Sequence, residues 1–145
     1  MDLFRRRVIA KHYEAIAPFR ADLELPVTYR SRLVEGEVFM QMKTVEGEPN
    51  SESIVELAEV RGTLARYRLR PVTGKRHQLR AHMSALGIPI SNDRIYPTLW
   101  PASKTQEEFS AEYARPLQLL AKRVEFLDPI LNIARCFESD RRLEW

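Results

Sequence analysis

The chain contains very little cysteine or histidine and no long apolar run. Its 145 residues include one cysteine, Cys136, and three histidines. A lone cysteine cannot form a disulfide within the chain, and so few Cys and His side chains argue against a structural zinc site. No apolar stretch approaches the roughly 20 residues of a membrane-spanning helix, and the N-terminus lacks the uncharged core of a secretion signal. We therefore expect a cytoplasmic protein without a structural zinc site or a membrane span.

Repeats and low-complexity linkers are also missing, so the length fits a single domain. An apolar fraction of 44% is too high for a disordered chain. Short segments rich in β-branched residues predict strands over residues 5–18, 27–45, 53–72 and 116–130, with a further short strand over 133–137. The second and third segments are each hairpins, with turns at Glu35-Gly36 and Arg61-Gly62. Residues 103–114 are either a short helix or a loop insertion.

One helix is predicted after the second hairpin. Leu79, Met83 and Leu86 are spaced at i, i+4 and i+7, which makes an apolar stripe that should face the core. Thr73 is the predicted N-cap, and Gly87 is the predicted residue just beyond the C-terminal end. Hairpins with one main helix predict an α+β domain with a mixed, mainly antiparallel sheet on which this helix packs.

Negative charge is absent from Val60 to Asn92, although the whole chain carries a net charge of only +3. A patch of one sign on a nearly balanced chain is typical of proteins that bind phosphate groups. A solvated basic face without a partner explains the charges equally well. Alternation along a strand should place several of these arginines on one face of the sheet, which by itself is more typical of an exposed sheet face. They are Arg66, Arg68 and Arg70.

The start of the predicted helix carries cations where the backbone is already positive. Lys75, Arg76 and Arg80 lie there, and each misplaced cation costs about 0.3–1 kcal/mol. A docked anion would reverse this penalty, because backbone N–H groups and side chains would then converge on it. Gly74 would let such a ligand approach the backbone closely. We therefore favour an anion site over a surface turn that merely tolerates its charges.

The same segment contains a longer pattern, "PVTGKRHQLRAHMSALGIPI", followed by Asp93 and Tyr96. It resembles the signature of the RluA-type pseudouridine synthases, which runs Pro-x-Thr-Gly-Arg-x-His-Gln-[Ile/Leu]-Arg-x-His, then Leu-Gly-His-Pro-Ile, Gly-Asp and Tyr. Residues 5–18 resemble the Lys-x-Tyr-x-Ala strand of that family, and residues 116–130 resemble its late strand. Departures from the family pattern indicate a divergent subfamily; they are Lys75, Ile88, Asn92 and Leu120.

The resemblance implies an isomerase that converts uridine to pseudouridine in structured RNA, ribosomal or transfer, without a cofactor. Arg80 matches the family's active-site arginine, which pairs with a nucleophilic aspartate. Tyr13 matches the tyrosine that lies against the target base. The residues expected to contact RNA are Lys75, Arg76, His77, Gln78, Arg66, Arg68 and Arg70. For His77 and Gln78, hydrogen bonds that lock the loop are an equally good explanation. We expect Asp93 to be structural, as the cap of a turn before Tyr96, and His82 to pack beside the apolar stripe.

The family's nucleophile lies in a His-Arg-Leu-Asp motif that this sequence lacks. None of its aspartates has that context; they are Asp2, Asp22, Asp93, Asp128 and Asp140. We therefore expect residues 1–145 to be the C-terminal portion of an RluA-like catalytic domain, inactive alone and completed by its missing N-terminal part, and otherwise a monomer. Two alternatives stay open: a non-catalytic RNA-binding module of the same ancestry, and an unrelated domain that binds a small anion.

Overall fold

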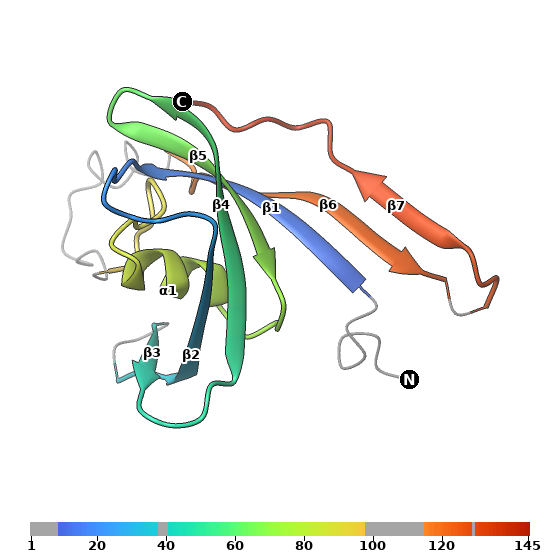
Figure 1. Cartoon of the computed structure of the whole chain (residues 1–145), viewed down its shortest axis with the longest axis horizontal. Coiled ribbons are helices and arrows are strands. Elements are labelled where there is room, and N and C mark those ends of the chain that lie inside the picture. The colour runs from blue at the N-terminus through green and yellow to red at the C-terminus, as the bar shows by residue number, and fades with distance from the viewer. Residues whose placement is uncertain (1–8, 38–40, 98–114, 129) are drawn as a thin grey trace, which may run out of the picture.

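The computed structural model describes residues 9–37, 41–97, 115–128 and 130–145. In these ranges the chain forms seven strands and one helix. The strands are β1 (Ile9–Pro18), β2 (Val27–Glu35), β3 (Met42–Val45), β4 (Ser51–Arg61), β5 (Leu64–Pro71), β6 (Leu119–Leu127) and β7 (Ala134–Glu138). The helix is α1 (Gln78–Ala85), and Figure 1 shows it beside the β2–β4–β5 end of the sheet while β6 and β7 extend away from it.

The strands form one twisted sheet in the order β3-β2-β4-β5-β1-β6-β7. Every pairing in the described part is antiparallel, so the mainly antiparallel sheet and the α+β class are confirmed. The second predicted hairpin is also confirmed, with its turn at Gly62-Thr63, one residue later than expected. Gly62 has a φ of 61°, a left-handed conformation that tight hairpin turns require and that glycine adopts without strain.

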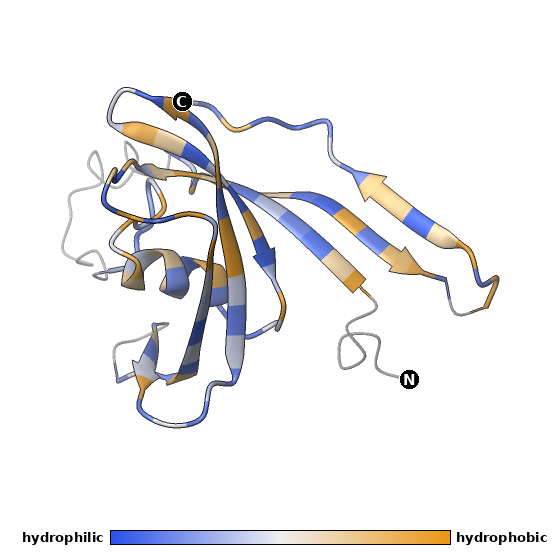
Figure 2. Ribbon diagram, in the orientation of Figure 1, coloured by the Kyte–Doolittle hydropathy of each residue, from blue (hydrophilic) through white to orange (hydrophobic). Residues whose placement is uncertain are grey.

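The core lies between α1 and one face of the sheet. Tyr67 and Leu69 of β5 point to this face, and both are at most 1% exposed. The predicted apolar stripe meets them: Leu79 and Met83 are buried, and Leu86 packs at the edge of the same cluster. Figure 2 shows the alternation of apolar and polar residues along the strands that gives the sheet its two different faces.

The helix ends as predicted but starts later than predicted. Gly87 has a φ of 81°, its N–H donates to the Ser84 carbonyl, and the next N–H donates to the Met83 carbonyl, which is a Schellman ending. Thr73 is not the N-cap: its hydroxyl accepts from the Glu52 N–H of β4 instead. Because residues 72 and 73 stay bonded to β4, the helix begins only at Gln78.

This late start changes the argument about misplaced cations. Lys75 and Arg76 precede α1 in an exposed loop, so only Arg80 lies in the first helical turn. The helix nevertheless has no acidic residue in that turn and no side-chain cap at His77. The predicted helix or insertion at 103–114 lies outside the described residues. Within the described ranges, no helix is long and apolar enough to cross a membrane.

Candidate active site

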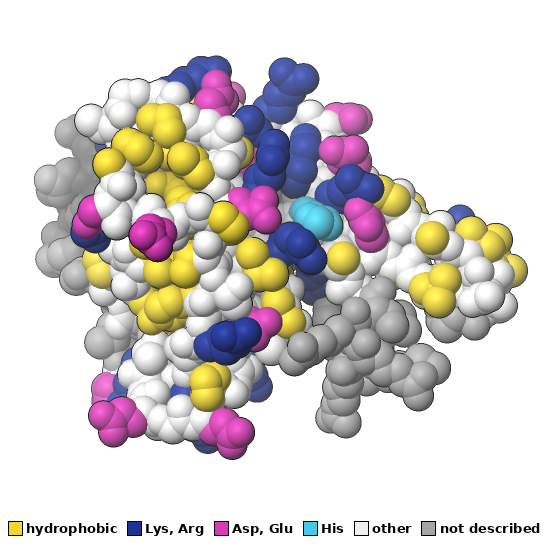
Figure 3. Space-filling view, viewed as in Figure 1, with side chains coloured by type: hydrophobic (Ala, Val, Ile, Leu, Met, Phe, Trp, Pro, Cys, Tyr) yellow, Lys and Arg dark blue, Asp and Glu magenta, His cyan; other side chains and the backbone are white. Residues whose placement is uncertain are grey.

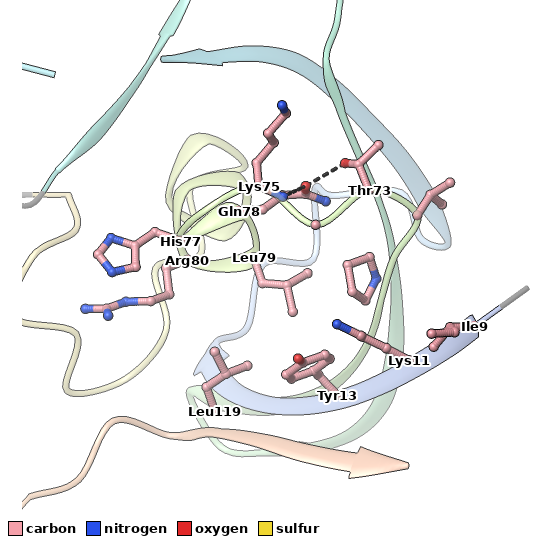
Figure 4. Close-up of a pocket in the computed structure, with 13 residues that line it drawn as sticks. Ile9, Lys11, Tyr13, Thr73, Lys75, His77, Gln78, Leu79, Arg80 and Leu119 are labelled. Atoms are coloured by element: carbon pink, nitrogen blue, oxygen red, sulfur yellow. Dashed lines mark hydrogen bonds between the residues drawn. The ribbon is translucent and has the colours of Figure 1, made fainter. Parts of the chain in front are cut away.

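A hollow of about 290 Å³ opens between β1, the loop that precedes α1, and the start of β6. Its lining comes from three separate parts of the sequence: Ile9, Lys11, Tyr13, Pro71, Val72, Thr73, Gly74, Lys75, His77, Gln78, Leu79, Arg80 and Leu119. Figure 4 shows Lys11, Tyr13 and Leu79 around this space, with Arg80 and His77 extending side by side beyond Leu79. The two residues predicted to be catalytic, Tyr13 and Arg80, therefore border one pocket.

The face of β1 that forms the pocket is set by strand geometry. Tyr13 lies opposite Leu69 of β5, so its side chain is on the same side of the sheet as the core. Lys11 precedes it by two residues and shares that side, which places an ammonium group next to the tyrosine ring. Strand alternation in the sequence already placed Lys11 and Tyr13 on one face, although only Tyr13 was predicted to be catalytic.

Arg80 forms a forked ion pair with Asp93. Its Nη2 donates to Asp93 Oδ1 at 2.7 Å and its Nε to Oδ2 at 3.0 Å. The Asp93 side chain is 1% exposed and also accepts the backbone N–H groups of Ile95 and Tyr96. The expected turn cap at Asp93 is thus present, but its pairing with Arg80 was not foreseen. The buried carboxylate of Asp93 therefore fixes the position of the Arg80 guanidinium.

Arg80 keeps hydrogen-bonding capacity after this pairing. A guanidinium has five N–H donors, and Asp93 occupies one edge of the fork. The Arg80 side chain is 17% exposed and borders the pocket, with the Tyr96 ring 5.6 Å from its Cζ. A second anion, either a carboxylate or a phosphate, can therefore bind at the remaining edge while the positive charge stays oriented.

The loop before α1 is held by the side chain of Gln78. Its Oε1 accepts from the Thr73 hydroxyl at 2.6 Å and from the Lys75 N–H at 3.1 Å. Its Nε2 donates to the Glu52 carbonyl at 2.8 Å and to Ser53 Oγ at 2.9 Å. Gln78 is 4% exposed, so these four bonds use its whole amide. The geometry gives it the loop-locking part of its two predicted roles.

The same network continues to a buried histidine one helical turn later. His82 is 1% exposed, and its Nδ1 lies 2.8 Å from Ser53 Oγ. Ser51 Oγ donates its own proton to the Ser31 carbonyl, so towards His82 Nε2 it can only accept. This favours the tautomer with the imidazole proton on Nε2, in which Nδ1 accepts the hydroxyl proton of Ser53. Burial lowers the pKa of His82 to about 4, which keeps the ring neutral. His82 had been interpreted as simple packing, but it joins α1 to β2 and β4 through hydrogen bonds.

His77 turns the chain into the helix in a left-handed conformation, with a φ of 53°. Its Nδ1 lies 3.2 Å from the Tyr96 hydroxyl, and the two rings meet edge to face. The Tyr96 hydroxyl also accepts the Met42 N–H, so this contact ties the loop to β3. Beside it, Lys75 and Arg76 remain exposed and face solvent.

The strand arginines lie on the other face of the sheet. Arg66 and Arg68 alternate with the buried Tyr67 and Leu69, so they point away from α1 and from the pocket. Arg66 pairs with Glu14 at 2.7 Å and with Glu59 at 3.6 Å. Figure 3 shows Lys and Arg side chains among Asp and Glu side chains around a histidine. The predicted alignment of Arg66, Arg68 and Arg70 is real, but the structure does not bring them to Arg80.

Comparison with known proteins supplies the family. A family model described as "RNA pseudouridylate synthase" matches residues 1–85. Dual-specificity RNA pseudouridine synthase RluA of Pasteurella multocida (strain Pm70) is 33% identical over 100 residues, which cover 64% of this chain and 43% of that protein. The Haemophilus influenzae (strain ATCC 51907 / DSM 11121 / KW20 / Rd) protein of the same name is 34% identical over 95 residues, with the same coverage. The chain thus spans less than half the length of these relatives.

Solved structures show the same fold. Human RNA pseudouridylate synthase domain containing 1 superposes with a TM-score of 0.70 at 22% identity, over 94% of this chain and 57% of that one. Human RNA pseudouridylate synthase domain containing 4 gives a TM-score of 0.66 at 23% identity, over 98% and 60%. The family match covers more than half of the chain, and the predicted resemblance is confirmed. The chain belongs to the RNA pseudouridylate synthase family and is of the RluA type.

Proposed function

We propose that this chain forms the arginine and tyrosine side of a pseudouridine synthase active site that acts on uridine in structured ribosomal or transfer RNA. The observation that carries the proposal is the pocket itself. It is bordered by Tyr13 from β1 and by Arg80 from α1, the two positions that match the family's catalytic pattern. The relatives named above are RNA pseudouridine synthases, and this supports the same reaction here.

In this proposal, Arg80 holds the nucleophile. The reaction breaks the bond between uracil N1 and ribose C1′, turns the base, forms a bond from C5 to C1′, and removes the proton from C5. The free edge of the Arg80 guanidinium keeps an aspartate ionised and oriented, while Asp93 fixes the arginine itself. That aspartate comes from a polypeptide segment outside these 145 residues, the N-terminal part of the same catalytic domain, because no aspartate here has the His-Arg-Leu-Asp context.

Tyr13 and the loop cations have separate tasks. The target uridine has to leave its stack, which costs a few kcal/mol. Tyr13 offers its ring to the flipped base on the core side of β1. Lys75 lines the pocket, and both Lys75 and its neighbour Arg76 are exposed, so phosphates of the RNA can approach them. His77 and Gln78 position this loop.

The three strand arginines have a weaker part in the proposal. Arg66, Arg68 and Arg70 lie on the face away from the pocket, beside several carboxylates. They add to the long-range attraction for RNA and do not touch the nucleotides in the pocket. This difference in position provides a matched control, because Arg68 has the same chemistry as Arg80 at an exposed site.

The test is pseudouridine formation by the natural protein that contains this chain, measured by chemical labelling of pseudouridine and primer extension. Arg80→Ala should lower conversion by about a hundredfold or more, with only a modest loss of RNA binding. Arg68→Ala should lower conversion far less than Arg80→Ala, because it removes only long-range attraction for RNA. Tyr13→Phe should cost less than Tyr13→Leu if the ring stacks on the base. The reverse order would instead assign proton transfer to the hydroxyl, and conversion that survives Arg80→Ala would refute the proposal.

Two further properties accompany the proposal. We expect a monomer in the cytoplasm, which light scattering and cell fractionation can check. If the natural protein binds RNA but never converts uridine, the non-catalytic RNA-binding module becomes the better description. The intact mass of the natural protein bears on the same choice, since a mass well above 16.9 kDa would provide room for the aspartate segment.

A further inference from the structure

A second hollow adjoins the pocket along the sheet. It has a volume of about 410 Å³ and shares Lys11 and Tyr13 with the first. Its remaining lining comes from β6, from β7 and from the residue that follows β7: Ala121, Lys122, Arg123, Val124, Phe137, Glu138 and Ser139. The two hollows therefore adjoin at Lys11 and Tyr13, and the second, here called the groove, extends from there toward the β7 edge of the sheet.

An aromatic ring stands at the far end of this groove. Lys11 lies opposite Val124, which in turn lies opposite Phe137, so these three side chains form one row across β1, β6 and β7. Phe137 is 58% exposed, although a phenylalanine normally buries its ring. Phe126 stacks on it with ring centroids 6.0 Å apart and an interplanar angle of 16°.

The charge of the groove is mainly positive. Lys11, Lys122 and Arg123 line it, against the single carboxylate of Glu138. Lys122 donates to the carbonyl oxygens of Ser139 and Arg141 at 2.8 and 3.0 Å. These partners are neutral, so within the described residues the positive charge of Lys122 is not matched by a carboxylate. Arg123 differs, because Glu125 pairs with it at 2.7 Å.

We propose that this groove binds a nucleotide of single-stranded RNA that flanks the target uridine, with its base stacked on Phe137 and its phosphate near Lys122. The inference rests on the proposed function, and it extends that function to a second subsite. An exposed aromatic ring beside a basic groove suits single-stranded nucleic acid, because every base has a face that can stack and every phosphate link carries a charge. Continuity with Tyr13 favours RNA over a protein partner as the occupant.

The test measures binding of a labelled single-stranded RNA of about ten nucleotides by fluorescence anisotropy over a range of salt concentrations. Phe137→Leu should weaken binding about tenfold without changing the salt dependence, since stacking releases no counterions. Phe137→Tyr keeps a ring and should bind like the wild type. Phe19→Leu is the matched control, because Phe19 is also exposed but lies in a different hollow, bordered by Leu23 and Leu57.

The Lys75→Gln variant tests RNA binding at the pocket, independently of the proposed subsite at Phe137. It should weaken binding and reduce the salt slope by about 0.7, the value of one lost phosphate contact on a single strand. If Lys75→Gln weakens binding and Phe137→Leu does not, the subsite is refuted while the pocket stands. If Phe137→Leu changes only the oligomeric state in light scattering, the ring serves a protein interface and the subsite is likewise refuted. If the natural protein that contains this chain binds no RNA, both proposals are overturned.

Discussion

Acid should destabilise this protein through one buried histidine. His82 is 1% exposed and neutral, and the groups in contact with its ring are uncharged: Ser31, Ser51, Ser53 and Tyr29. Its Nδ1 accepts the hydroxyl proton of Ser53, so protonation at this atom would break that hydrogen bond as well as place a charge in the core. We therefore predict that unfolding becomes easier between about pH 6.5 and about pH 4.

The direction and the size of the change in stability follow from the pKa values of the His82 imidazole in the folded and the unfolded chain. Burial lowers the pKa of His82 from 6.5 to about 4 in the folded state. Between these values the unfolded chain binds more protons, so stability falls as the pH falls. One pKa unit corresponds to about 1.4 kcal/mol, which gives a loss of about 2 kcal/mol at about pH 5 and about 3 kcal/mol below about pH 4.

The assay is urea unfolding followed by fluorescence at several pH values, for the wild type and for His82→Gln. Carboxylates titrate in the same range, so the informative quantity is the difference between the two curves. We expect the wild type to lose about 2 kcal/mol more than the variant between about pH 7 and about pH 5. Parallel curves would refute the reasoning. Nitrogen chemical shifts of the imidazole give an independent check, because the network requires the proton on Nε2.

Two further predictions concern single contacts. Asp93→Asn should destabilise the fold by about 3 kcal/mol in urea unfolding, because it leaves the guanidinium of Arg80 without its buried carboxylate; a loss below about 1 kcal/mol would show that the pair is weak. Gly87→Ala should lower the free energy of unfolding by about 1 kcal/mol or more, since its φ is 81° and an added Cβ would meet Arg20 Nη1. Gly74→Ala is its control, because a Cβ there meets nothing within 4 Å and should leave stability unchanged.

Local patterns predicted most of the fold. The hairpins, the apolar stripe of α1 and the Schellman ending at Gly87 all depend on residues a few positions apart, so the sequence shows them directly. The predicted start of the helix was wrong, because the interaction that delays the helix joins residues far apart in the sequence. Thr73 has the chemistry of an N-cap, but its hydroxyl bonds to Glu52 on β4, a residue 21 positions away. Nothing near Thr73 in the sequence indicates that partner.

For the candidate site, too, the sequence predicted some features and not others. The pattern around Arg80 and the Lys-x-Tyr-x-Ala strand indicated which residues to examine, and their alternation placed Lys11 and Tyr13 on one face. The ion pair of Arg80 with Asp93 is different, because it depends on the path of the chain after α1. Asp93 had an evident role as a turn cap, and that role is confirmed, but a turn cap says nothing about a second partner.

The sequence by itself determined the family, the α+β class and the identity of the two side chains proposed to act, because each is encoded in spacing and residue type. Only the tertiary structure decided which cationic side chains lie near the pocket and which lie on the opposite face of the sheet. Val60 to Asn92 reads as one basic stretch, yet the β5 arginines point away from α1, whereas Arg80 lies on the helix side and borders the pocket. The reason is physical: successive strand residues face opposite sides of a sheet, and the packing of one helix decides which side becomes the pocket.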